Sequence, residues 1–310
     1  MAEEFAERML RTMNEAALAL MVSVGHRTGL FDTMAGMSAA TSAEIASTAG
    51  LDERYVREWL AVMATGRIVE HDGEAGTYSL PAEHAAWLTR AARMQNLATG
   101  MQYIGLMAMV EDQIVECFRH GGGVPYSAFP RFQAVMAEDS GAVHDATLID
   151  GTLPLVPGLT GRLADGIDVA DVGCGSGHAV NLMAAAFPRS RFTGFDFVTT
   201  FDAVHDQARP DLMLAGIAAA LRPGGTYLCV DTSASSKLAE NLNHPLATFL
   251  YTVSCMHCMT VSLADGGMGL GTMWGEQTAR KMLGEAGFTS VEAKRVDGDI
   301  VNAYIIAIKA

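Results

Sequence analysis

The feature that most constrains this chain is a strand, a glycine-rich turn and a helix that follow one another between residues 167 and 187. Residues Ile167–Val172 form a short apolar run of the kind that makes a strand buried on both faces. Glycine occupies every second position from 173 to 177, and a helix is expected over His178–Phe187, before Pro188. Such a turn lets a ligand lie against bare backbone amides at a helix N-terminus. The stretch therefore predicts a cofactor cradle in an α/β domain.

The spacing of the glycines indicates which cofactor fits. A dinucleotide fingerprint, G-x-G-x-x-G, would require glycine at the position of His178, which disfavours a nicotinamide dehydrogenase. The pattern Asp171-x-Gly173-x-Gly175-x-Gly177 instead resembles the first motif of the class I S-adenosylmethionine-dependent methyltransferases. Two later stretches agree with that family, namely a second strand ending in an acid, Arg191–Asp196, and the sequence Leu221–Gly225 followed by a fifth strand, Tyr227–Asp231. The alternative is an ordinary strand–helix turn with chance glycines, which would not explain why the three motifs follow one another in the family's order.

The resemblance implies a Rossmann-like methyltransferase sheet, the cofactor S-adenosyl-L-methionine, and an enzyme that methylates a small molecule by in-line transfer. It assigns the methionyl end of the cofactor to the glycine turn and Asp171, the ribose to Asp196, and the edge of the fourth strand to Asp202. A sulfonium sulfur already activates the methyl group, so the protein mainly aligns donor and acceptor and excludes water.

One unit of that sheet is missing from the sequence. After Arg191–Phe197 a doubly wound fold needs a crossover of about a dozen residues or more before the next parallel strand. The chain continues at once with Val198–Asp206, which resembles the family's fourth strand. The missing helix, strand and loops would amount to roughly 35 to 45 residues. Either the chain lacks this unit, or the sequence joins the two sides of an omitted segment; taken as it stands, it predicts a truncated sheet with an open adenine side.

The rest of the chain predicts a second domain. Thr41 and Glu44 form a capping box, a second helix follows, and glycine at 73 and 76 indicates a hairpin. These elements resemble the N-terminal winged helix of many small-molecule methyltransferases. We therefore expect an all-α/winged-helix dimerisation domain over residues 1–90, a helical linker or lid over 91–150, and the methyltransferase domain over 151–310.

The N-terminal 24 residues or so of that winged-helix domain carry an apolar stripe at helical spacing. It consists of Phe5, Met9, Met13, Ala16, Leu20 and Val24. The stripe would suit packing within the domain or against a second subunit, and we favour a homodimer.

Charge argues against nucleic acid as a partner. The net charge is −14, and residues 1–90 hold 7 arginines, no lysine and 13 acidic residues. The start of the chain lacks the basic region of a signal peptide, and no apolar run reaches the roughly 18 residues of a membrane span. An odd number of cysteines, 5, suggests reduced thiols. We expect a cytoplasmic protein with no membrane or nucleic-acid partner.

The candidates for catalysis are histidines. Cys255-x-x-Cys258 encloses His257, but a structural zinc site needs four ligands and the other cysteines are scattered, so no metal is expected. His257 could act as a base or touch the substrate, although a histidine on an apolar helix is more often a hydrogen-bonded core residue. His205, next to Asp206 after the fourth strand, is a comparable candidate.

Two aromatic residues are candidate substrate contacts. Tyr251 and Trp274 could face a sulfonium through cation–π attraction, although core packing is their default role. The rival to an enzyme is a catalytically impaired winged-helix transcriptional regulator or ligand sensor, which would bind the cofactor weakly.

Overall fold

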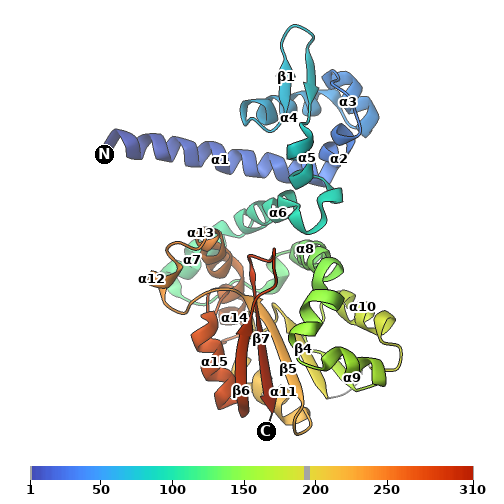
Figure 1. The fold of residues 1–310 in the computed structure, drawn as a ribbon. Helices are drawn as coiled ribbons and strands as arrows, with labels where there is room; N and C mark the ends of the chain where they lie inside the picture. The colour runs from blue at the N-terminus through green and yellow to red at the C-terminus, as the bar shows by residue number, and fades with distance from the viewer. Residues whose placement is uncertain (1, 192–195, 310) are drawn as a thin grey trace. The chain divides into compact units, whose positions relative to one another are not determined.

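The computed structural model describes residues 2–191 and 196–309. The chain divides into two compact units, residues 1–108 and 109–310. The two units divide after Ala108, whereas the sequence predicts boundaries at 90 and 150. Helix α6 (Leu97–Ala108) packs along α1 (Ala2–Thr28), and the following helices belong to the second unit. Figure 1 shows the element order.

The first unit is a winged helix preceded by a long helix. After α1 come α2 (Leu30–Ala35), α3 (Ser42–Ala49), α4 (Glu53–Thr65), the antiparallel hairpin β1 (Glu70–Asp72) and β2 (Thr77–Ser79), and then α5 (Ala82–Leu88). The predicted capping box is confirmed, since the Thr41 side chain accepts from the Glu44 amide and the Glu44 carboxylate accepts from the Thr41 amide. Gly50 ends that helix in the left-handed conformation, as a C-cap glycine does.

The core of this unit centres on Trp59. Its indole is 1% exposed, packs edge-on against Phe31 at 5.2 Å, and donates from Nε1 to the Met21 carbonyl at 2.8 Å. Gly25 on α1 faces the same ring, because a Cβ there would lie 2.5 Å from it. The N-terminal half of α1 is by contrast exposed, including Phe5 at 58% and Met13 at 63%.

The second unit contains the predicted α/β sheet. Its described strands run in the order β3-β4-β5-β7-β6, with β3, β4 and β5 parallel and β7 antiparallel to β5. The strands are β3 (Val169–Asp171), β4 (Phe197–Phe201), β5 (Thr226–Thr232), β6 (Phe288–Lys294) and β7 (Asn302–Lys309). The carboxyl ends of three parallel strands thus meet at one edge, where α/β proteins bind ligands.

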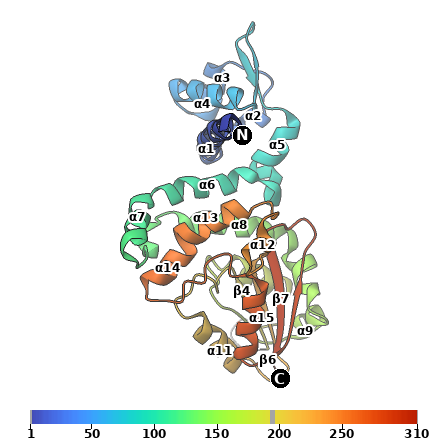
Figure 2. The same ribbon diagram turned by 90° about the vertical axis from the view of Figure 1, so that its left-hand side faces the viewer.

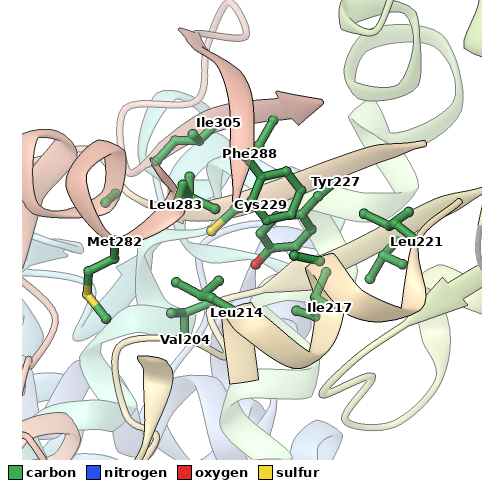
Figure 3. Packing of buried hydrophobic residues seen from close by; sticks show 14 of the residues in the cluster. Val204, Leu214, Ile217, Leu221, Tyr227, Cys229, Met282, Leu283, Phe288 and Ile305 are labelled. Atoms are coloured by element: carbon green, nitrogen blue, oxygen red, sulfur yellow. The ribbon is translucent and has the colours of Figure 1, made fainter. Parts of the chain in front are cut away.

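Helices cover both faces of the sheet. Successive side chains of β5 point to opposite faces, and those on each face are buried against helices. Tyr227 and Cys229 pack with α11 (Pro210–Ala220) and α15 (Gly275–Glu285), while Leu228 and Val230 pack with α9 (Leu159–Asp165) and α10 (His178–Ala186). Figure 2 shows α11 and α9 on opposite sides of the strands. Figure 3 shows the first layer, with the Tyr227 and Phe288 rings beside one another at 5.7 Å.

The sheet ends at β3 in the part of the chain that the structure describes. The predicted strand Arg191–Asp196 lies largely outside the described residues, but Arg191 forms a parallel bridge with Asp168. Arg191 bonds the backbone of Ile167 and Val169, whereas Phe197 bonds that of Asp168. The backbone groups of successive residues in a strand point to opposite sides. Arg191 therefore lies on one side of β3, and Phe197 lies on the other. Among the described residues, the sheet has no strand beyond β3 apart from this bridge, in agreement with the expected truncation.

The helical region after β5 runs without interruption from Ala247 to Ala264 as α13 (Ala247–Val253), a π-turn (Ser254–Cys258) and α14 (Met259–Ala264). By length and composition these 18 residues could cross a membrane, contrary to the sequence expectation, although the core helix of a soluble domain passes the same test. Here the run packs within the second unit, with Thr260 and Ser262 buried at 2% and 1% exposure.

Candidate functional site

The glycine turn follows β3 and is open. Gly173, Gly175 and Gly177 all adopt positive φ, at 78°, 51° and 76°, which few other residues tolerate. Residues 173–176 are exposed, and a Cβ on Gly175 would meet nothing within 4 Å. A Cβ on Gly173 would lie 2.6 Å from the Cβ of Ala203, so the turn packs directly against the segment that follows β4. The predicted cradle is therefore open at Gly175 and bounded by Ala203 at Gly173.

Asp171 lies at the end of β3, where the turn begins. Its Oδ1 accepts a hydrogen bond from the Thr199 hydroxyl at 2.9 Å, while its Oδ2 is buried and has no hydrogen-bond partner among the described residues. Burial raises the pKa of Asp171 to about 6, although the Thr199 bond opposes the shift. A buried, incompletely satisfied carboxylate next to exposed amides is arranged to meet a ligand rather than to stabilise the fold.

Asp196 does not lie near this turn. It precedes β4, whose first residue pairs with the first residue of β3, so Asp196 is at the amino edge of the sheet while the turn is at the carboxyl edge. Its Oδ2 accepts from Arg222 at 2.6 Å, and Arg222 also donates to Asp168 at 2.8 Å. The ribose role expected for Asp196 is therefore corrected: its carboxylate belongs to an ion cluster that ties the amino ends of the edge strands together.

Helix α8 (Phe132–Thr147) brings further polar groups to the turn. His178, the first residue of α10, has its Nε2 2.8 Å from the Asp145 carboxylate. His144 packs edge-on against Phe201, the last residue of β4, at 4.5 Å. Burial lowers the pKa of His144 to about 4, and the nearby His178 adds to the shift, so the imidazole is neutral at physiological pH.

A second polar cluster lies at the ends of β4 and β5. Asp202 and His205 follow β4, and Asp231 is the penultimate residue of β5. One potential ligand atom from each of the three lies within 4.8 Å of the others. The His205 Nδ1 is 2.7 Å from the Asp231 Oδ1, which also accepts from the Thr232 amide and from the Trp274 indole at 2.8 and 3.0 Å. The other Asp231 oxygen is buried without a partner in the described part of the chain.

The charges of this cluster perturb one another. Burial alone would lower the pKa of His205, but the Asp231 carboxylate, with Cys258 contributing, holds that pKa well above its ordinary value. Burial, together with repulsion by Asp231, raises the pKa of Asp202 to about 7. Strongly perturbed groups gathered in this way mark functional sites more often than structural ones.

The other predicted histidine, His257, is enclosed by rings. It stacks face to face on Phe132 at 3.4 Å and meets Tyr126 and Phe129 edge-on at 5.0 and 4.6 Å. Burial lowers the pKa of His257 to about 3, and repulsion from His205 adds to the shift. His257 is thus a neutral member of an aromatic cluster, and its Nε2 is buried without a hydrogen-bond partner among the described residues.

The structure separates the two aromatic candidates. Trp274 is buried and donates to Asp231, within the polar cluster. The Tyr251 hydroxyl accepts instead from Asn241 at 3.1 Å, and Asn241 lines a polar cavity of 400 Å³ beside α15. The arginines of that cavity are already paired with Glu276. We therefore place the candidate site at the glycine turn and the polar cluster, where the perturbed groups lie.

Comparison with known proteins agrees with this geometry. Residues 16–90 match the model of the Rv2258c-like winged HTH domain, while no curated protein sequence matches the chain. Human N-acetylserotonin methyltransferase, solved in complex with SAM, is similar in structure over 98% of each chain, with a TM-score of 0.68 and 17% identity. The mitomycin 7-O-methyltransferase MmcR is similar over 99% of each chain, with a TM-score of 0.69 and 16% identity. The chain has the fold of a class I methyltransferase with an N-terminal winged helix.

This methyltransferase fold extends to further structures. An O-methyltransferase family protein from Burkholderia thailandensis is similar over 98% of each chain, with a TM-score of 0.65 and 13% identity. Asp231 was missed as a site residue in the sequence, where it is only the acid that ends a predicted strand. The signal was available, because the carboxyl ends of neighbouring parallel strands meet at one edge.

Proposed function

We propose that this protein is an S-adenosyl-L-methionine-dependent methyltransferase that acts on a small molecule. The observation that carries the proposal is the open glycine turn beside the unpartnered, buried oxygen of Asp171. Exposed amides bind a carboxylate, and a carboxylate attracts an ammonium or sulfonium group. An amino acid end that bears both charges fits this turn.

The residues present fit the methionyl half of the cofactor better than its nucleoside half. Asp171, Gly173, Gly175 and Gly177 would hold the methionyl end, and Asp202 would line the edge beside the turn. Asp196 is engaged elsewhere, and the described sheet offers no strand beyond β3 to carry another ribose-binding acid. When bound, the cofactor supplies an activated methyl group. The chain's own task is to hold the acceptor in line and to keep water out.

His205 is the better of the two histidines for handling the acceptor's proton. It lies in the segment that packs against the glycine turn. Its partner Asp231 fixes the ring and would stabilise the imidazolium that forms when the neutral ring accepts the acceptor's proton. His257 is neutral and enclosed by rings, which suits it to lining an apolar acceptor pocket. Trp274 would support the pocket through Asp231, whereas the position of Tyr251 favours no contact with the acceptor.

Calorimetric titration with S-adenosylhomocysteine tests the proposal. We expect micromolar binding by the native chain and a loss of at least tenfold in Gly175→Val, because a branched side chain would fill the turn. Gly216→Ala is the matched control, since a Cβ on Gly216 in α11 also meets nothing within 4 Å but lies away from the turn. No detectable binding up to millimolar S-adenosylhomocysteine would instead favour a winged-helix regulator or ligand sensor.

We further propose a homodimer formed through α1. The support is the exposed apolar half of that helix, with Phe5, Leu10 and Met13 all more than half exposed in a single chain. Light scattering of Met13→Asp tests it: a shift from two chains to one is expected, and an unchanged mass that equals one chain in both proteins would refute it. Arg27→Asp, a charge change on the same helix beyond this stripe, is the control.

We also propose that the first unit does not bind nucleic acid and that the protein is cytoplasmic. The two arginines of α4 are both paired within the helix, Arg54 with Glu58 and Arg57 with Glu53. These acids would compete with phosphates for the arginines. A fluorescence titration with duplex DNA at low salt, showing no saturable binding, is the expected result.

A further inference from the structure

We propose that His144 binds the amino acid end of the cofactor, with its Nδ1 accepting a hydrogen bond from the cofactor's ammonium group. The inference rests on the proposed function. It adds to the cofactor site a residue from helix α8, which belongs neither to the glycine turn nor to the strands beside it.

One face of α8 is held against the start of α10, directly after the glycine turn. The Asp145 carboxylate lies 2.8 Å from the Nε2 of His178, and a Cβ on Gly141 would lie 3.7 Å from the same imidazole ring. Residues three and four apart share a helix face, so His144 belongs to the face that makes both contacts. The His144 and His178 rings are stacked with their centroids 6.4 Å apart. These contacts place His144 beside the turn.

His144 also lies on the Asp171 side of the sheet. Its ring packs edge-on against Phe201 at 4.5 Å. Thr199 and Phe201 are two residues apart on β4, so their side chains point to the same face, and the Thr199 hydroxyl donates to Asp171. The His144 ring and the Asp171 carboxylate therefore meet the same face of the sheet at its carboxyl edge, where the glycine turn begins.

Each of these two side chains has a buried atom that lacks a partner. The Nδ1 of His144 and the Oδ2 of Asp171 find no hydrogen-bond partner among the residues that the structure describes. Buried polar atoms are rarely left in this state, because each costs free energy unless something binds there. A carboxylate can only accept, and a neutral imidazole has one nitrogen that accepts. An ammonium group, with three donors, could satisfy both atoms.

The charge of the His144 ring suits a cationic ligand. Burial, with repulsion from His178, lowers the pKa of His144 to about 4, so the ring is neutral near pH 7. A protonated ring would repel an ammonium group, whereas a neutral ring offers it a lone pair. The exposed amides of the glycine turn remain available for the carboxylate of the same amino acid end.

Calorimetric titration with two ligands at pH 7.5 tests the inference. S-adenosylhomocysteine carries the amino acid end, whereas 5′-methylthioadenosine has the same nucleoside and sulfur without it. His144→Phe keeps a ring beside Phe201 but has no acceptor nitrogen. We expect it to bind S-adenosylhomocysteine about tenfold more weakly than the native chain, because hydrogen bonds to charged groups are among the stronger ones. Its affinity for 5′-methylthioadenosine should be unchanged.

Two further variants complete the titration. His144→Asn places an amide oxygen near the position of Nδ1 and should recover part of the lost affinity for S-adenosylhomocysteine. The matched control is His71→Phe, because the His71 ring also contacts an aromatic ring, that of Tyr78, but lies in the hairpin of the first unit. Its affinity for both ligands should equal that of the native chain.

Nuclear magnetic resonance of protein with isotope-labelled histidine observes the proposed nitrogen directly. The His144 signals are those that disappear in His144→Phe. Nδ1 should be unprotonated at pH 7.5, and its chemical shift should change with S-adenosylhomocysteine but not with 5′-methylthioadenosine. A protonated Nδ1, or a shift that S-adenosylhomocysteine leaves unchanged, would overturn the inference. This measurement decides the question if 5′-methylthioadenosine binds too weakly to titrate.

The outcomes separate this inference from the proposed function. Native binding of S-adenosylhomocysteine with equal affinity in His144→Phe would overturn the inference and leave the proposed function standing. Equal losses of affinity for both ligands would show that His144 only supports the fold, which would also overturn it. No binding of S-adenosylhomocysteine by the native chain would count against the proposed function, and against this inference with it.

Discussion

Asp171→Asn should stabilise the ligand-free protein while weakening its cofactor site. In the folded protein the pKa of Asp171 is about 6, against an ordinary value of 3.8, so folding disfavours the ionised carboxylate. A raised carboxyl pKa contributes stability that is present below pH 3.8 and lost as the pH rises through 6. The difference between these two pKa values, 3.8 and about 6, lowers the free energy of unfolding by at most about 3 kcal/mol at pH 7.5. About 1.6 kcal/mol of this is already lost at pH 5.

The substitution isolates this cost. Asparagine keeps an oxygen that accepts the Thr199 hydroxyl, but it carries no charge to be desolvated. The free energy of unfolding in urea, followed by circular dichroism, should therefore rise in Asp171→Asn, and by roughly twice as much at pH 7.5 as at pH 5. Binding of S-adenosylhomocysteine should fall by about tenfold or more, because a charge-assisted contact contributes roughly 1.5–3 kcal/mol.

Asp168→Asn is the matched control at the other end of the same strand. Hydrogen bonds from Arg191 and Arg222 lower the pKa of Asp168, so its loss should destabilise the protein at pH 7.5, the opposite sign from Asp171. An effect of Asp171→Asn that does not change with pH, or a loss of stability at both pH values, would refute the reasoning. That reasoning holds that burial of the Asp171 carboxylate destabilises the folded protein and that the carboxylate serves ligand binding.

Two further substitutions test the packing of each unit. Arg222→Gln removes the donor to two carboxylates at the amino edge of the sheet and should lower the free energy of unfolding, whereas Arg209→Gln removes the donor to a single exposed carboxylate and should change it less. Gly25→Ala would place a methyl group 2.5 Å from the Trp59 indole and should cost about 1–3 kcal/mol. Gly100→Ala, at an unobstructed helix position, should instead stabilise by about 0.5–1 kcal/mol, and equal melting temperatures for the two glycine variants would contradict this.

The local elements of this protein follow from short-range sequence. The capping box at Thr41, the glycine turn after β3 and the hairpin of the first unit each depend on residues a few positions apart, and each forms as predicted. Their signals are steric and hydrogen-bonding preferences of the backbone, which need no distant partner. The shortage of residues after Phe197 likewise indicates the missing crossover from the sequence alone.

Tertiary structure decided which of the polar residues meet. Asp196 was expected to end a strand, but β4 begins only at Phe197. The parallel ladder between β3 and β4 therefore places Asp196 at the amino edge of the sheet, beside Arg222. His205 meets Asp231 across 26 positions and Trp274 joins them from 43 positions further on. Parallel pairing of β4 and β5 and the packing of the segment before α15 create that cluster. Finding it therefore requires the order of the strands in the sheet, not a local sequence pattern.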